Sequence, residues 1–166
     1  RPHPQTMTAA RATSMKILVL HGPNLNLFGR REPHIYGKTT LAEINARLQA
    51  LAGELGVTLE TLQSNHEGDL IDFLHAHIDD AQGALVNPAG LTQHGVPLHD
   101  AIKAMPFPTI EVHMSNIAAR EAWRAHSIIS PRASGVQLAL GTAILAVVIA
   151  RAAWQERGKR PNVSWD

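Results

Sequence analysis

The chain has 166 residues, of which 45% are hydrophobic and 17% charged, a balance that suits one globular domain. Its net charge of +1 gives no sign of a nucleic-acid groove or of a surface for anionic membranes. Because cysteine is absent, disulfides, thiol nucleophiles and thiolate metal sites are excluded, and a reducing cytoplasmic location is expected by default.

The ends of the chain differ from its middle in composition. Residues 1–14 lack the apolar core of a signal peptide and are expected to be a flexible leader or residues left from expression. We predict a single α/β domain over residues 15–157 and a flexible tail over residues 158–166. The longest apolar stretch, residues 138–150, is short for a membrane span.

Apolar residues follow two patterns, short continuous runs and stretches with helical spacing. The first helical stretch shows clear signals at both ends, because a capping box at Thr40 and Glu43 precedes it and Gly56 follows it. In chain order we expect a strand at 16–21, a helix at 41–55, a strand at 57–63, a helix from 67 to about 78, a strand at 84–87, a helix at 96–105, a strand at 109–113, a helix at 117–125, a strand at 135–140 and a helix at 141–156.

This alternation predicts a doubly wound sheet of about five parallel strands with helices on both faces. In such a sheet the ligand site lies beyond the carboxyl ends of the strands. Polar residues follow each of the first four predicted strands at that edge, in the segments 21–26, 63–67, 87–95 and 113–116.

The segment that ends the fourth strand carries the strongest chemical signal. Glu111, His113 and Ser115 recur at period two and are expected on one side of the strand. A carboxylate two residues from an imidazole favours the imidazolium, which makes His113 a candidate proton donor. Ser115 and Asn116 are expected to cap the following helix, whose free amides could hold an anion. A histidine bonded to Glu111 for structural reasons is the alternative.

A second signal is the long connection between residues 22 and 38, which is typical of an active-site lid. It contains Tyr36, the only tyrosine, and Arg31. A guanidinium near a phenol favours the phenolate, which can abstract a proton. A surface tyrosine accompanied by solvated arginines is the alternative.

Other polar residues give weaker signals. Asn87 ends a buried strand before a turn, where its amide could orient a small polar ligand. Arg120 and Arg124 lie four apart on a predicted helix and could share one face. No metal site is expected, because His75 and His77 would point in nearly opposite directions on their helix. The chain has neither a dinucleotide-binding nor a P-loop motif, and a flavin is suggested by the fold alone.

Four blocks of sequence together resemble the type II 3-dehydroquinate dehydratases from about residue 15 to residue 157. The blocks are residues 20–33 with Tyr36 and Gly37, residues 63–68, residues 87–100 and residues 111–124. The resemblance implies a flavodoxin-like fold and a hydro-lyase that converts 3-dehydroquinate to 3-dehydroshikimate without a cofactor. It also implies a homo-oligomer, a dodecamer built from trimers.

Carried over residue by residue, the resemblance implies a role for each matching position. Tyr36 would remove the proton at C2, with Arg31 stabilising its phenolate, and Asn24 would hold the water or the enolate oxygen. His113, oriented and charged by Glu111, would protonate the departing C1 hydroxyl. The substrate-binding residues would be Asn87, Gln93, Asp100, Met114, Ser115 and Arg124, with Asp100 reaching the site of a neighbouring subunit.

Two positions depart from the family pattern. Gln93 stands where the family has a histidine that contacts a ring hydroxyl, and Ala118 stands where histidine is common. A glutamine can donate and accept hydrogen bonds but cannot titrate. The alternatives are therefore a non-catalytic or substrate-shifted paralogue that binds a small polyhydroxy carboxylate and, more remotely, a flavin electron carrier. The sequence does not distinguish aromatic amino acid biosynthesis from quinate catabolism, because both use this elimination.

Overall fold

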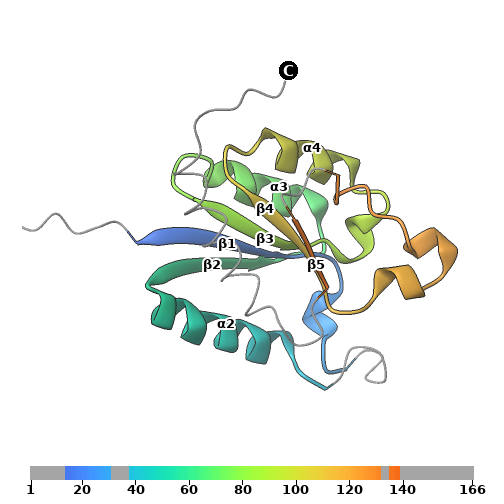
Figure 1. Ribbon diagram of the computed structural model, residues 1–166, viewed down its shortest axis with the longest axis horizontal. Helices are drawn as coiled ribbons and strands as arrows, with labels where there is room; N and C mark the ends of the chain where they lie inside the picture. Colours follow the sequence, from blue (N-terminus) through green and yellow to red (C-terminus); the bar gives the residue numbers. More distant parts are fainter. Residues whose placement is uncertain (1–13, 31–37, 132–134, 139–166) are drawn as a thin grey trace, which may run out of the picture.

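A computed structural model describes residues 14–30 and 38–131, and the backbone of residues 135–138. Within these residues one parallel sheet has the strand order β2-β1-β3-β4-β5 (Figure 1). Its strands are β1 Met15–His21, β2 Val57–Gln63, β3 Gly83–Asn87, β4 Thr109–His113 and β5 Gly135–Leu138. This order is that of the flavodoxin-like fold, so the predicted doubly wound sheet is confirmed.

In the described part of the chain, three α-helices cover the two faces of the sheet (Figure 1). They are α2 Leu41–Leu55 on one face, and α3 Glu67–Ala76 and α4 Val96–Ala104 on the other. Short 3-10 helices follow the carboxyl ends of three strands: η1 Leu25–Leu27, η2 Ala89–Thr92, η3 Ile117–Ala119 and η4 Ala122–Arg124. Among the described residues, no helix is long and apolar enough to cross a membrane.

The start of α2 confirms the predicted capping box. The Thr40 hydroxyl accepts a hydrogen bond from the Glu43 backbone N–H at 3.2 Å, and the Glu43 carboxylate accepts one from the Thr40 backbone N–H at 2.7 Å. The helix ends at Gly56, whose φ of +65° lies in the left-handed region that glycine adopts without strain. Strong local signals at both ends thus define this helix.

A hydrophobic core lies on each face of the sheet, and strand β1 contributes side chains to both because these alternate between the faces. Ile17 and Val19 belong to the core beneath α2, whereas Leu18 and Leu20 belong to the core beneath α3 and α4. All four are at most 3% exposed. Burial on both faces explains why β1 is almost continuously apolar.

The predicted helix over residues 117–125 is wrong. The chain instead forms η3 and η4, separated by Arg120 and Glu121 in extended conformations. Not one residue from 114 to 126 is buried, so a helix here would gain little from packing against the core, the main source of helix stability in proteins. The predicted cap is present at η3, where Asn116 Oδ1 accepts from the Ala118 backbone N–H at 3.0 Å, but Arg120 and Arg124 do not share the face of one α-helix.

One smaller difference concerns the helix after β2. Helix α3 ends at Ala76, short of Ile78, and His77 lies beyond it with its ring bonded to Glu60 and Asp80. The predicted helix over 141–156 and the tail over 158–166 lie outside the described residues, as does the leader apart from Ser14.

Candidate active site

A cavity of about 280 Å³ lies at the carboxyl end of the sheet, where the site was predicted. The strand register brings the polar ends together, because His21 of β1 pairs with Asn87 of β3, and Val86 pairs with Glu111 of β4. The walls come from the turn after β1, from η2 and from the segment after β4. Seven predicted site residues line the cavity: Asn24, Asn87, Gln93, His113, Met114, Ser115 and Arg124.

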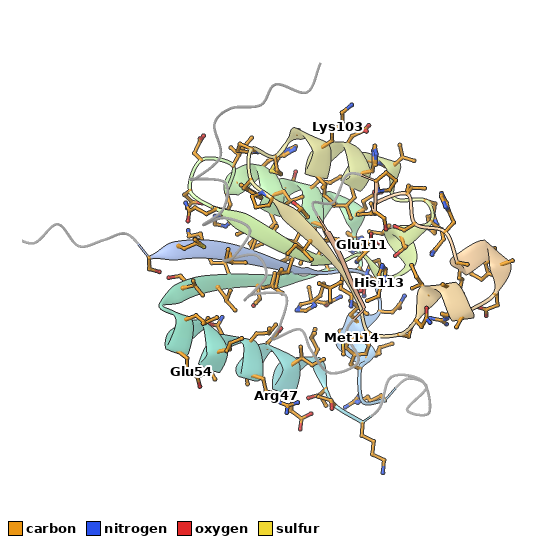
Figure 2. The ribbon with its side chains drawn as sticks, viewed as in Figure 1. Arg47, Glu54, Lys103, Glu111, His113 and Met114 are labelled. Atoms are coloured by element: carbon orange, nitrogen blue, oxygen red, sulfur yellow. The ribbon has the colours of Figure 1, made fainter. Side chains whose placement is uncertain are left out.

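The centre of the site is a hydrogen-bonded pair formed by Glu111 and His113, which lie two residues apart at the end of β4 (Figure 2). The His113 Nε2–H donates to Glu111 Oε1 at 2.7 Å. Glu111 is fully buried and His113 is 5% exposed. Because Nε2 faces the carboxylate, Nδ1 is the ring nitrogen left to exchange a proton with a ligand in the cavity.

Two serines complete the surroundings of the Glu111 carboxylate. Ser127 Oγ donates to Oε1 at 2.7 Å, and the Ser130 hydroxyl donates to Oε2. Burial by itself raises the pKa of Glu111, but the hydrogen bonds from His113, Ser130 and Ser127 outweigh it and hold that pKa below its usual range. Glu111 is therefore a buried carboxylate that stabilises a positive charge on the neighbouring ring.

Sequence reasoning missed both serines. They stand 16 and 19 positions after Glu111 and follow no motif, so only the fold brings them to it. The one available signal was the pair of hydroxyl residues that flanks two isoleucines in Ser127-Ile-Ile-Ser130. The second of those isoleucines, Ile129, is fully buried, and this places the serines beside the core.

Asn24 is held at the cavity by the turn after β1. Its φ is +68°, a left-handed conformation that asparagine tolerates better than most residues, and its backbone N–H donates to Asn65 Oδ1 at 2.9 Å. Gly22 makes this turn possible, since a Cβ atom there would lie 2.5 Å from the Pro88 carbonyl oxygen. The Gly22 backbone N–H donates to Asn87 O at 2.8 Å and so joins the Asn24 turn to the end of β3.

Asn87 has its side chain oriented by the next turn. Its Oδ1 accepts a hydrogen bond from the backbone N–H of Ala89 at 3.3 Å. The amide NH₂ of Asn87 is thus the end that can donate to an oxygen atom of a ligand. Ala89 itself has a φ of +52°, which costs a non-glycine residue about 1–2 kcal/mol. Backbone strain of this kind is concentrated at functional sites.

Arg120 and Arg124 bring positive charge to the cavity from the segment after β4. The Arg124 guanidinium stacks on the Trp123 ring, with Cζ 4.1 Å from the ring centroid. Its Nε lies 3.4 Å from Glu121 Oε2 but makes no hydrogen bond, so this contact is an ion pair without hydrogen-bond geometry. The two arginines suit the cavity to an anionic or hydroxyl-rich ligand.

Four predicted site residues do not line the cavity, the first being Glu111, which is buried behind His113. Asp100 lies on α4 with 70% of its side chain exposed, and its Oδ1 accepts from His99 Nδ1 at 2.9 Å. Its predicted contact with a neighbouring subunit stays a prediction. Arg31 and Tyr36 lie outside the described residues, in the predicted lid. Among the residues that are described, no group of three or more histidines, aspartates or glutamates could hold a metal ion.

The fold and the site define a flavodoxin-like α/β protein with a histidine–carboxylate pair beside a small cationic cavity. The family model described as "Dehydroquinase class II" matches residues 15–153. The chain therefore belongs to the class II dehydroquinase family. It is 57% identical over 127 residues to a curated 3-dehydroquinate dehydratase of Roseiflexus castenholzii, covering 76% of this chain and 81% of that protein.

Further relatives support the same family. A catabolic 3-dehydroquinase of Aspergillus oryzae is 50% identical over 125 residues, which cover 75% of this chain and 82% of the relative. The crystal structure of a type II dehydroquinase from Butyrivibrio crossotus is 32% identical, with a TM-score of 0.81, and covers 83% of this chain and 98% of its own. The corresponding structure from Propionibacterium acnes is 39% identical, with a TM-score of 0.77 and coverages of 84% and 99%.

Proposed function

We propose that this chain dehydrates 3-dehydroquinate to 3-dehydroshikimate, the hydro-lyase reaction named in its curated relatives. The observation that carries the proposal is the Glu111–His113 pair, buried at the wall of a cavity that two arginines also line. An imidazolium that is hydrogen-bonded to a buried carboxylate is suited to protonating a leaving group. The substrate is a carboxylate with several hydroxyls, which matches the cationic and amide-rich wall.

The acid half of the reaction is assigned to His113. A β-hydroxyl leaves poorly as hydroxide, so the His113 Nδ1 proton transfers to the oxygen as the C1–O bond breaks, the electron pair of the enolate forms the C1=C2 double bond, and water departs. The neutral imidazole that remains keeps its Nε2–H on Glu111. The elimination changes no oxidation state overall and needs no cofactor in this mechanism.

The base half is assigned to Tyr36, with Arg31 holding its phenolate. The phenolate removes the C2 proton, and the electron pair moves onto the ketone oxygen to give an enolate, whose oxygen Asn24 stabilises directly or through a water molecule. The position of Phe28 supports this assignment, because it lines the cavity shortly before the segment that carries Arg31 and Tyr36. A lid that starts at the cavity can bring a base to it.

Substrate binding is assigned to the remaining cavity residues. The Asn87 amide, the Ser115 hydroxyl and the backbone amides of Met114 and Ser115 would receive the carboxylate, and Arg124 would contact ring hydroxyls. Gln93 remains in the wall, but one of its amide N–H groups donates to the Arg124 carbonyl at 3.0 Å. A direct hydroxyl contact would use its other N–H or its carbonyl oxygen.

The direct test is turnover of 3-dehydroquinate by the purified protein, followed by the ultraviolet absorbance of the conjugated product. Wild-type protein should form this product, whereas Tyr36→Phe should fold normally and lose activity by several orders of magnitude, because its ring has no ionisable oxygen. Folded wild-type protein without turnover at every pH tested would overturn the proposal. A paralogue that only binds would show ligand-dependent thermal stabilisation without product, and the relatives do not favour that reading.

We also propose that the chain assembles as a dodecamer built from trimers, in which Asp100 reaches the site of a neighbouring subunit. Two exposed side chains of α4 support this proposal, because Asp100 and the apolar Val96 lie one turn apart and could both face another subunit. Val96 is 57% exposed, and the side chain of Asp100 is 70% exposed. Light scattering should give a mass near twelve chains, and Asp100→Asn should raise KM in the assembled enzyme. A monomer with full activity would contradict the proposal.

A cytoplasmic location, favoured by the cysteine-free composition, stays a prediction.

A further inference from the structure

One wall of the cavity is formed by the segment 114–126, which carries Arg120 and Arg124. None of its residues is buried, and Met114 at its start is the one that packs against a hydrophobic core, so hydrophobic burial does little to fix the position of residues 115–126. Many of its backbone hydrogen bonds are local, such as Arg120 N to Ile117 O and Arg124 N to Glu121 O. These bonds shape the two short helices but do not attach them to the rest of the fold. The position of the wall therefore depends on the contacts that reach it from other elements.

Two adjacent residues at the end of η2 supply such contacts. Thr92 O accepts from the Ile128 backbone N–H at 2.9 Å, just beyond the segment, and Gln93 Nε2 donates to Arg124 O at 3.0 Å. The turn they belong to is itself well anchored. Thr92 is 1% exposed, and its hydroxyl donates to Ala89 O at 2.6 Å. Gln93 thus connects a firmly held turn to the peptide group of a cavity arginine.

We propose that Gln93 is a positioning residue that acts through Arg124. The stacking on Trp123 and the ion pair with Glu121 orient the guanidinium, but both partners belong to the same segment as Arg124. They set the direction of the guanidinium relative to the segment. The amide of Gln93 sets the segment relative to η2 and so places the guanidinium relative to Asn87 of β3 and His113 of β4. This inference rests on the proposed function, which supplies the ligand of the cavity.

The first experiment compares Gln93→Leu with wild type in steady-state turnover of 3-dehydroquinate. Leucine is of similar size but cannot donate, so KM should rise roughly 2- to 10-fold, as expected for one neutral hydrogen bond, while kcat stays within about 2-fold. Gln49→Leu is the matched control. Gln49 Nε2 donates to Leu59 O at 3.3 Å beneath the sheet, so its loss removes the same kind of bond away from the cavity and should leave KM unchanged.

A double-mutant cycle separates positioning from direct ligand contact. If Gln93 acts through the Arg124 guanidinium, Gln93→Leu should raise KM little further in an Arg124→Ala background, because the group it positions has been removed. If Gln93 binds the substrate itself, the two increases should multiply. Additive free energies in this cycle would overturn the proposal while leaving the dehydratase function intact.

Two further readouts do not depend on which role the arginine plays in turnover. Gln93→Glu can donate to the Arg124 carbonyl only when its carboxyl is protonated, so the KM of this variant relative to that of wild type should rise with increasing pH. The other titratable or charged residues that line the cavity are common to both proteins: His94, His113, Arg120 and Arg124. In ligand-free protein, Gln93→Leu should accelerate amide hydrogen exchange over residues 114–126, and Gln49→Leu should not. Unchanged exchange there would overturn the proposal even if wild-type protein proved inactive.

Discussion

Ser127 offers a sharp test of how the Glu111 carboxylate is held. Its hydroxyl donates to Glu111 Oε1 at 2.7 Å and accepts from the backbone N–H groups of Ile129 and Ser130, each at 3.1 Å. Ser127→Ala removes a hydrogen bond to a charged group, worth about 1.5–3 kcal/mol, and leaves two backbone donors without their partner. We expect the free energy of unfolding at neutral pH to fall by about 2–4 kcal/mol.

The matched control is Ser64, which also donates to a carboxylate and accepts from a backbone N–H. Its hydroxyl donates to Asp69 Oδ2 at 2.6 Å and accepts from the His66 backbone N–H at 2.9 Å. Ser64→Ala should lower stability by a smaller amount, because the Asp69 carboxylate is exposed and only one backbone donor loses its partner. Only Ser127→Ala should also lower kcat, by roughly 10-fold for each 1.4 kcal/mol added to the activation barrier, because Glu111 loses a hydrogen bond that orients it toward His113. Equal effects of the two variants on kcat would refute the role given to Glu111.

The stability difference between wild type and Ser127→Ala should depend on pH in a definite direction. The pKa of Glu111 is depressed in the folded protein, so its contribution to stability is present above the unfolded pKa and is lost as pH falls through the folded pKa. Removing the Ser127 hydroxyl raises that pKa. In urea unfolding at one fixed protein concentration, the difference between wild type and Ser127→Ala should therefore be largest near neutral pH and shrink in acid. A difference that grows in acid would contradict the reasoning.

Two further predictions concern residues at the end of β1. Burial lowers the pKa of His21, so its neutral form stabilises the fold above the unfolded pKa of about 6.5 and that contribution is lost as pH falls below it. His21→Gln should weaken the decline in unfolding free energy between about pH 7 and 5, and an unchanged slope would contradict this assignment. Gly22→Ala would place a Cβ atom 2.5 Å from the Pro88 carbonyl oxygen, so we expect a loss of several kcal/mol in chemical denaturation, and near-wild-type stability would contradict the observed turn.

The elements predicted correctly are those whose signals are local. Strand β2 and helix α2 were located at their observed bounds, because the capping box, the glycine stop and the apolar pattern all lie within the elements or next to them. The segment 117–125 has a helix-like composition but was predicted wrongly, because its apolar residues find no core to join. Helix formation there depended on tertiary contacts that a periodic pattern does not show.

The residues of the site also differ in whether local sequence predicts them. Glu111 and His113 could be paired from the alternation of one strand, and the observed 2.7 Å hydrogen bond confirms the pair. Ser127 and Ser130 could not be found, since their contacts with Glu111 span a long loop whose path only the fold determines. Gln93 was expected at the cavity and lies there, but its bond to a backbone carbonyl was not foreseeable from residue type.

The most direct test of the central claim, that His113 supplies the acid for the departing hydroxyl, is proton NMR of 3-dehydroquinate in D₂O with His113→Asn. The base assigned to the lid remains in this variant, so the C2 hydrogen should still exchange with deuterium while loss of water falls by at least about 100-fold. Dehydration at a rate near that of wild type would contradict the account.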